Sequence, residues 1–365
     1  MPIVLWTDAL VFLSIITIIT TIYWIICDPQ LRGRWQQVLQ KPSCCVAAIV
    51  FAAFVIIGTL DSMHYVETAT NTINSLLDWL LRPISQIQET SYSAPFARHL
   101  LNKEIVINED GQLNWTAPKL IYNYHVFGTD KIGIDVLYAS LKSVRTGLVI
   151  GFLTTIFTLP FAIFFGAAAG YFGGKIDDVI QYIYTTISSI PAVLLIAASM
   201  LSLDGLIANN STMFNFAQQR SDARLLLLCA ILGLTSWTSL CRMLRAETLK
   251  IRTQEFILSA KALGASNWRI IWRHVLPNLL HIILIAIVLD FSGLVLSEAV
   301  LTYIGVGVDP TMFSWGNIIN SARLEMGCDP IIWWTLAGAF VLMFSLVLAA
   351  NIFADEIRTV FDSRA

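Results

Sequence analysis

The stretch from Arg245 to Asn278 reads RAETLKIRTQEFILSAKALGASNWRIIWRHVLPN and lies between two long apolar runs. It contains six Lys and Arg residues but only two acidic residues, Glu247 and Glu255. A segment with this many charges cannot lie in hydrocarbon, and an excess of basic residues in a short loop marks the cytoplasmic side of a membrane. The stretch, called here the basic loop, therefore predicts a cytoplasmic connection between two membrane spans.

The composition of the whole chain supports a membrane protein. Hydrophobic residues make up 56% of the 365 residues and charged residues only 13%, with a mean hydropathy of +0.69. A soluble domain carries about a quarter charged residues. The net charge of −2 argues against a nucleic-acid binder, which presents a large basic excess. We therefore expect an all-α, polytopic membrane protein that binds no nucleic acid and lies in the lipid bilayer.

Seven apolar segments are long enough to cross a bilayer. The first, Ala9–Cys27, follows no basic residue and ends in bulky side chains, so we interpret it as a retained span and not as a cleaved signal peptide. Small residues from Gly166 to Gly170 predict close contact between helices, and Pro191 predicts a kink. The seven segments are Ala9–Cys27, Cys44–Leu60, Thr146–Gly174, Val179–Leu203, Leu225–Cys241, Leu279–Leu301 and Ile331–Phe353.

These segments divide the chain into four regions. Residues 1–43 hold the amino-terminal span and a basic linker, and residues 44–60 hold the second span. Residues 61–145 mix acids, bases and prolines without a spanning segment, so we expect an external segment there. Residues 146–365 hold the remaining spans and the basic loop, residues 245–278. With that loop inside, seven crossings place the amino terminus outside and the carboxyl terminus in the cytoplasm.

The basic loop also carries an ordered motif. Leu258-Ser259-Ala260 precedes Gly264, and His274-Val-Leu-Pro277 begins ten residues after this glycine. The arrangement resembles the cytoplasmic EAA loop of binding-protein-dependent ABC importer permeases, in which an EAA motif and a glycine are followed by x-x-L-P. Leu258 stands where the family pattern has an acidic residue.

Three further stretches, in family order, are similar to the oligopeptide, dipeptide and nickel permeases of the second-subunit type. His125-Val-Phe-Gly-Thr-Asp-Lys-Ile-Gly-Ile-Asp135 resembles H-x-L-G-T-D-x-x-G-R-D, with Ile134 in place of the arginine. Gly170-Tyr-Phe-Gly-Gly-Lys-Ile-Asp177 resembles the turn G-Y-x-G-G-x-x-D. Glu298-Ala-Val-Leu-Thr-Tyr-Ile-Gly-Val-Gly307 resembles E-A-x-L-S-F-L-G-L-G. The resemblance implies a six-span core, to which Ala9–Cys27 is an addition.

The resemblance also implies that the basic loop seats a short helix on a separate ATPase. Residues from Thr253 to Leu263 suit such a helix, because Phe256, Ile257, Ala260 and Leu263 supply an apolar face. The alternative is an ordinary basic loop on the cytoplasmic side without a coupling role. The predicted coupling residues are Phe256, Leu258, Ser259, Ala260, Leu263, Gly264, His274 and Pro277.

Two acidic residues lie in the sixth apolar segment. Asp290 stands near its middle, where an ionised carboxylate costs at least about 2.5–3.5 kcal/mol. It is a candidate for the translocation pathway of a cationic or zwitterionic substrate, and the alternative is a packed, hydrogen-bonded or protonated acid between helices. Glu298 belongs to a motif of the resembled family near the external end, which favours a gate or a packing role.

The sequence contains no pattern typical of an enzyme. It lacks the phosphate loop G-x-x-x-x-G-K-[ST] and any H-E-x-x-H metal motif. The resemblance implies a transport subunit of a bacterial inner membrane, with ATP and Mg²⁺ bound by two partner ATPases. A homologous permease subunit and an external substrate-binding protein would complete the importer. Dipeptides, oligopeptides, antimicrobial peptides and nickel remain open as substrates, and the alternative is a membrane-embedded enzyme or receptor-like protein acting through residues 61–145.

Overall fold

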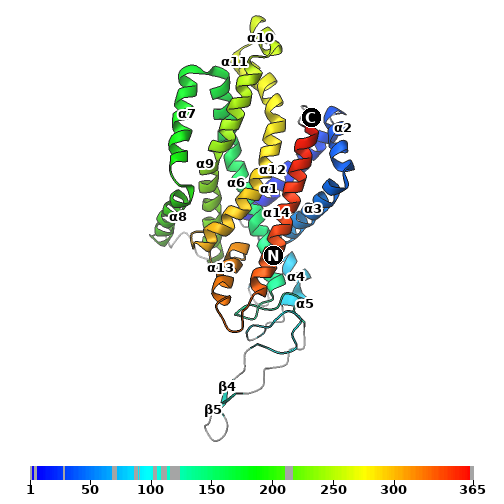
Figure 1. Cartoon of the computed structure of the whole chain (residues 1–365), viewed down its shortest axis with the longest axis vertical. Coiled ribbons are helices and arrows are strands. Elements are labelled where there is room, and N and C mark those ends of the chain that lie inside the picture. Colours follow the sequence, from blue (N-terminus) through cyan, green and yellow to red (C-terminus); the bar gives the residue numbers. More distant parts are fainter. Residues whose placement is uncertain are drawn as a thin grey trace. The chain divides into compact units, whose positions relative to one another are not determined.

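The structure of the chain is a computed structural model. It describes residues 2–3, 6–27, 29–67, 72–85, 89, 91–101, 105–107, 113–115, 124–209 and 217–361. These residues are mostly helical, and the expected all-α, polytopic architecture is confirmed (Figure 1). The chain forms two compact units. Unit 1 comprises Met1–Phe12, Ile49–Leu148 and Ser297–Leu348, and unit 2 comprises Leu13–Ala48, Val149–Leu296 and Ala349–Ala365.

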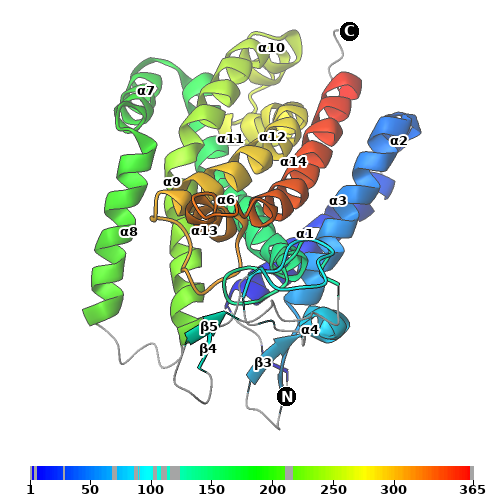
Figure 2. The same cartoon turned by 60° about the horizontal axis from the view of Figure 1, so that its bottom comes forward.

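Long helices account for most of the described residues (Figures 1 and 2). They are α1 (Trp6–Cys27), α2 (Pro29–Gln40), α3 (Pro42–Asp61), α6 (Val136–Phe172), α7 (Gly174–Ser189), α8 (Ala192–Asn209), α9 (Ala217–Arg252), α12 (Leu276–Tyr303), α13 (Trp315–Glu325) and α14 (Trp334–Phe361). Shorter helices are α4 (Leu76–Leu80), α5 (Arg82–Ser85), α10 (Glu255–Ala262) and α11 (Asn267–Ile270).

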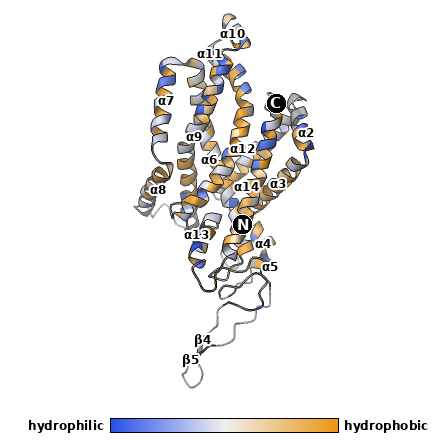
Figure 3. Ribbon diagram, in the orientation of Figure 1, coloured by the Kyte–Doolittle hydropathy of each residue, from blue (hydrophilic) through white to orange (hydrophobic). Residues whose placement is uncertain are grey.

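Five helices, α3, α6, α9, α12 and α14, are long and apolar enough among the described residues to cross a membrane. Figure 3 shows the apolar residues along much of α6, α12 and α14. Helices α7 and α8 form a sixth span if they are counted together, and they are bent by 80° at the break before Ala192. The kink predicted at Pro191 is thus confirmed as a break. In α1 the described apolar part is the shorter stretch Trp6–Thr17, so a span there stays a prediction.

In unit 2, α6 and α9 pack against each other through glycines. A methyl group at Gly166 would come within 2.8 Å of the Leu244 Cβ, and one at Gly170 within 2.5 Å of the Thr248 Cβ. Such distances leave no room for a side chain, and small residues four apart are the usual means of close helix contact in membranes. The prediction from the small residues Gly166–Gly170 is confirmed. Around this contact lies a core of buried residues that includes Trp237.

The amino-terminal part of unit 2 is fastened to α14. Lys41 Nζ lies 2.5 Å from Glu356 Oε2, and the Ser43 hydroxyl donates to Glu356 Oε1 at 3.0 Å. Beside these contacts, Val38 at the end of α2 is buried in one apolar cluster with Ile357. The linker that follows the first apolar segment therefore lies against the carboxyl-terminal part of α14.

Unit 1 contains the described part of residues 61–145. Strands β1 (Pro2–Ile3), β2 (His64–Glu67) and β3 (Thr72–Ser75) form an antiparallel sheet with β2 in the centre. A separate antiparallel pair joins β4 (Ile105–Ile107) to β5 (Leu113–Trp115). Most of the segment between residues 86 and 123 lies outside the described residues.

Helix α6 begins at Val136, ten residues before the span expected at Thr146. Asp135 starts it, because its Oδ1 accepts hydrogen bonds from the backbone N–H groups of Leu137 and Tyr138. The other Asp135 oxygen lies 2.7 Å from His125 Nδ1. The stretch from His125 to Asp135 thus ends in a helix cap.

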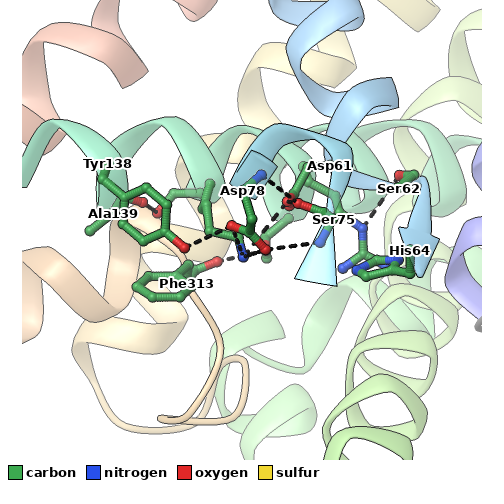
Figure 4. Close-up of polar contacts among 12 residues, drawn as sticks. Asp61, Ser62, His64, Ser75, Asp78, Tyr138, Ala139 and Phe313 are labelled. Atoms are coloured by element: carbon green, nitrogen blue, oxygen red, sulfur yellow. Dashed lines mark hydrogen bonds and ion pairs between the residues drawn. The ribbon is translucent and has the colours of Figure 1, made fainter. Parts of the chain in front are cut away.

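Lys142 and Arg145 lie in the part of α6 that precedes or borders the expected span, and carboxylates of unit 1 neutralise them. Figure 4 shows this polar region of unit 1, with Asp61, Asp78 and Tyr138 labelled. Lys142 Nζ lies 2.8 Å from Asp78 Oδ1, and the Arg145 Nη2 lies 2.5 Å from Asp8 Oδ1. Burial disfavours the ionised form of Asp78, but Lys142 and the other donors that face its carboxylate hold its pKa below the ordinary value. The fully buried Asp8 also lies 2.9 Å from His64 Nδ1, so the first turns of α1 are anchored within unit 1.

The close contact of α6 with α9 gives a prediction about stability. Gly170→Ala places a methyl group against Thr248, so we expect about 1–3 kcal/mol of destabilisation despite the better helix propensity of alanine. Gly205→Ala in α8 is the matched control, because nothing lies within 4 Å of a methyl group there. Thermal unfolding of the purified protein checks both. A Gly170→Ala protein as stable as the Gly205→Ala protein would contradict the packing described.

Candidate functional site

The basic loop begins inside a continuous helix, because α9 runs without a break to Arg252. Thr253 and Gln254 then lead to α10, which is the short helix predicted over Thr253–Leu263 and starts two residues later than predicted. Leu263 ends α10, and Gly264 follows with a φ of +79°. Only glycine adopts this left-handed conformation at little cost, so Gly264 sets the direction in which the chain leaves α10.

Helix α10 has one buried face. Ile257 is completely buried in the core of unit 2, and Ala260 packs against the same core. The sequence predicts a single apolar face that contains both residues and serves for docking. The structure differs, because Ile257 is buried in the core of unit 2 and cannot contact a partner. A helix of eight residues needs tertiary contacts to hold it, and these two side chains provide them.

The opposite face of α10 is exposed and still apolar. Phe256 is 41% exposed, Leu258 53% and Leu263 88%. Ser259 lies exposed between them, and Leu258 at the acidic position of the motif points away from the core. The outer face, defined as Phe256, Leu258, Ser259 and Leu263, therefore presents leucine and phenylalanine to whatever contacts α10.

The chain returns from α10 through α11 and a π-helical turn, Ile271–Val275. The N–H of Leu276 donates to the carbonyl of Ile271, five residues back. Pro277, which has no N–H, follows in the first turn of α12, where a helix tolerates proline. His274 is half-buried, with its ring centroid 6.3 Å from that of Phe256. His274 thus lies beside α10, and Pro277 begins α12 as predicted.

Other contacts within unit 2 hold the basic loop, and the sequence alone did not assign them. The Asp177 carboxylate in the first turn of α7 binds the Arg245 guanidinium through two hydrogen bonds of 2.5 and 2.7 Å. The Tyr171 hydroxyl donates to Asn267 Oδ1 at 3.1 Å. Both Asp177 and Tyr171 belong to the stretch Gly170–Asp177. The signal available in the sequence was the acidic residue Asp177, three positions after Gly174, but its partner lies 68 residues away.

Asp290 lies in unit 2 on an exposed side of α12. Among the residues that the structure describes, its carboxylate has no hydrogen-bond or ion-pair partner. A bare carboxylate midway along an apolar helix must meet water, a partner chain or a solute.

Glu298 lies in unit 1 and is 1% exposed. The Thr302 hydroxyl donates to its Oε1 at 2.8 Å. A methyl group at Gly316 would come within 3.0 Å of the same oxygen, so α13 packs closely on Glu298. These contacts favour packing of α12 with α13 over a role in a pathway. Within the described part of the chain, no three His, Cys, Asp or Glu residues are placed to hold a metal ion.

Comparison with known proteins agrees with these features. Residues 162–365, more than half of the chain, match the family described as binding-protein-dependent transport system inner membrane component. The chain is 31% identical over 241 residues to the dipeptide transport system permease protein DppC of Lactococcus lactis, covering 66% of this chain and 64% of that protein. It is 27% identical over 249 residues to the oligopeptide transport system permease protein OppC of Haemophilus influenzae, covering 68% and 73%.

The matched region includes the α6–α7 turn, the whole basic loop, Asp290 and Glu298. Helices α1 to α3 lie outside it. The chain spans less than two thirds of the length of the L. lactis relative. This chain therefore belongs to the family of binding-protein-dependent transport system inner membrane components.

Proposed function

We propose that this chain is a permease subunit of an ATP-driven ABC importer that moves di- or oligopeptides, or a related solute, into the cytoplasm by alternating access. The membership of the family and the names of the relatives support transport. The single observation that carries the coupling step is the division of α10 into a buried and an exposed face. Ile257 fixes the helix to unit 2, and the outer face remains free for a partner.

The coupling step follows from this arrangement. When two ATPase subunits close on ATP, a groove on one of them pushes the outer face of α10. Because α10 is held by its own buried face, the push passes to α9 and α12, with which the basic loop is continuous. ATP and Mg²⁺ are bound by the ATPases, so the chain itself is not an enzyme.

The proposed assembly contains a second, homologous permease subunit, two ATPases and an external substrate-binding protein. The basic loop then faces the cytoplasm, as its excess of basic residues requires. Lys41 and Glu356 form an ion pair, which supports placing the linker after α1 and the end of α14 on one side of the membrane. That side is the cytoplasm, and with α1 as the proposed seventh span the amino terminus lies outside. No observation favours the alternative of an enzyme or receptor acting through residues 61–145.

Asp290 is proposed to line the translocation pathway. Its exposed carboxylate is placed to contact the cationic amino group of a peptide. The second permease subunit closes the other side of the pathway. Glu298, which is buried, holds the end of α12 against α13 near the gate.

The outer face of α10 gives the first test. Burying a leucine side chain contributes about 1.5–3 kcal/mol, so Leu263→Glu should weaken binding of the ATPase by roughly 10- to 100-fold. Leu324→Glu on α13 is the matched control. Leu324 is also an exposed leucine, at 72%, but it lies in unit 1 and outside the basic loop, so its replacement should not change ATPase binding. The measurement is the amount of ATPase that is isolated with the tagged chain, together with peptide uptake. Full retention of ATPase and normal uptake in Leu263→Glu would contradict the coupling role.

Asp290 gives the second test. Asp290→Asn removes the charge but keeps the shape, so we expect uptake of peptides with a free amino terminus to fall about tenfold or more. Asp290→Glu keeps the charge and should retain more uptake than the asparagine variant. ATPase isolated with either variant should equal that of the unchanged protein. Equal uptake by all three proteins would show that Asp290 does not contact the substrate.

A further inference from the structure

The turn between α6 and α7 has an unusual backbone and contacts the end of α9. Gly173 and Gly174 follow one another with φ values of +67° and +56°. A methyl group on Gly173 would lie 2.9 Å from the Arg252 guanidinium. The glycines thus let the chain reverse direction beside the end of α9, where a larger residue would be strained at either position and crowded at Gly173.

Tyr171, just before these glycines, contacts three segments of the basic loop. Its backbone carbonyl accepts a hydrogen bond from Arg252 Nη1 at the end of α9, at 3.3 Å. Its ring lies 4.8 Å from Lys261 Nζ of α10, a distance at which a cation is attracted to an aromatic face. Its hydroxyl donates to Asn267 Oδ1 of α11. The side chain is 3% exposed, although the residue stands at the end of a helix.

Asp177 makes the matching contact on the other side of the turn. Arg245, Thr248 and Arg252 are spaced so that they share one face of α9, and all three meet the region from Gly170 to Asp177. The two parallel hydrogen bonds between Arg245 and Asp177 fix both the distance and the orientation of α7 relative to α9. Side chains of the pair are 23% and 13% exposed, so water screens them little.

We propose that Tyr171 and Asp177 are positioning residues that clamp the α6–α7 turn onto the basic loop, so that a displacement of α10 carries α7 with it. The proposal rests on the coupling role given to α10 above. Force then reaches α6 and α7 directly through the clamp, in addition to α9 and α12, which are connected to α10 along the chain. A cluster that served only to hold the helices together would not need to join the turn to α9, α10 and α11 at once.

The test uses the assembled transporter in proteoliposomes and measures peptides imported per ATP hydrolysed. Asp177→Asn breaks the charge-assisted pair, and we expect this ratio to fall about tenfold while the ATPase isolated with the chain stays constant. Asp178→Asn is the matched control, because Asp178 is the next residue on α7, is exposed and should leave the ratio unchanged. The exchanged pair Asp177→Arg with Arg245→Asp should restore part of the lost ratio.

Tyr171 provides a graded second series. Tyr171→Phe removes only the hydroxyl bonded to Asn267, and Tyr171→Leu also removes the ring that faces Lys261. The ratio should therefore fall further in the leucine variant than in the phenylalanine variant. If the unchanged protein imports peptide and the Asp177 and Tyr171 variants have a normal ratio of peptides imported per ATP hydrolysed, the clamp is overturned but the proposed function is not. Absence of an ATPase or of import with the unchanged protein would instead overturn the proposed function.

Discussion

The close approach of α6 to α9 is the contact on which the organisation of unit 2 depends. Gly166 and Gly170 leave no space for a side chain between the two helices, so their backbones lie almost in contact. The approach brings the end of α6 to the end of α9, and with it the α6–α7 turn to Arg245 and Arg252. The basic loop is therefore built on a pair of helices that cannot shift apart without losing contact along two turns.

In unit 1, ion pairs neutralise the charged residues of α6. Lys142 and Arg145 lie within α6, and each is neutralised by a carboxylate from a segment distant in sequence. Arg145 pairs with Asp8 of α1, which lies outside the region matched to the family. The start of α1 is thus tied to the rest of unit 1 by a buried ion pair, whose loss would leave an uncompensated charge and cost about 3–5 kcal/mol.

Local features could be predicted from the sequence. Charge density located the basic loop, Pro191 located the break between α7 and α8, and Gly264 and Pro277 located the turn after α10 and the start of α12. Each of these effects acts within a few residues of the side chain that causes it. The resemblance to a known family could also be found from the sequence, because the residues of its motifs are ordered along the chain.

Features that depend on distant partners could not be predicted. Helix α6 begins ten residues before the apolar run that predicted it, and Lys142 in this extension pairs with Asp78, 64 residues away in the sequence. Helical spacing placed Ile257 on the outer face, but the core of unit 2 buries it. The proposed clamp depends on the ion pair between Asp177 and Arg245, and no sequence pattern indicates that these two distant residues are in contact. Neighbouring elements decide which side of a short helix is buried, so the buried side of α10 could not be predicted without its tertiary contacts.

If the clamp transmits force, α10 and the α6–α7 turn move as one body when the ATPases close. The most direct measurement is the distance between spin labels at Ser259 of α10 and Lys175 of α7, both exposed, after replacement of the exposed cysteines Cys27, Cys45 and Cys328. It is made with and without ATP in a labelled complex that still imports peptide. The account predicts the same distance in both states. A distance that changes by several ångströms on ATP binding would contradict it.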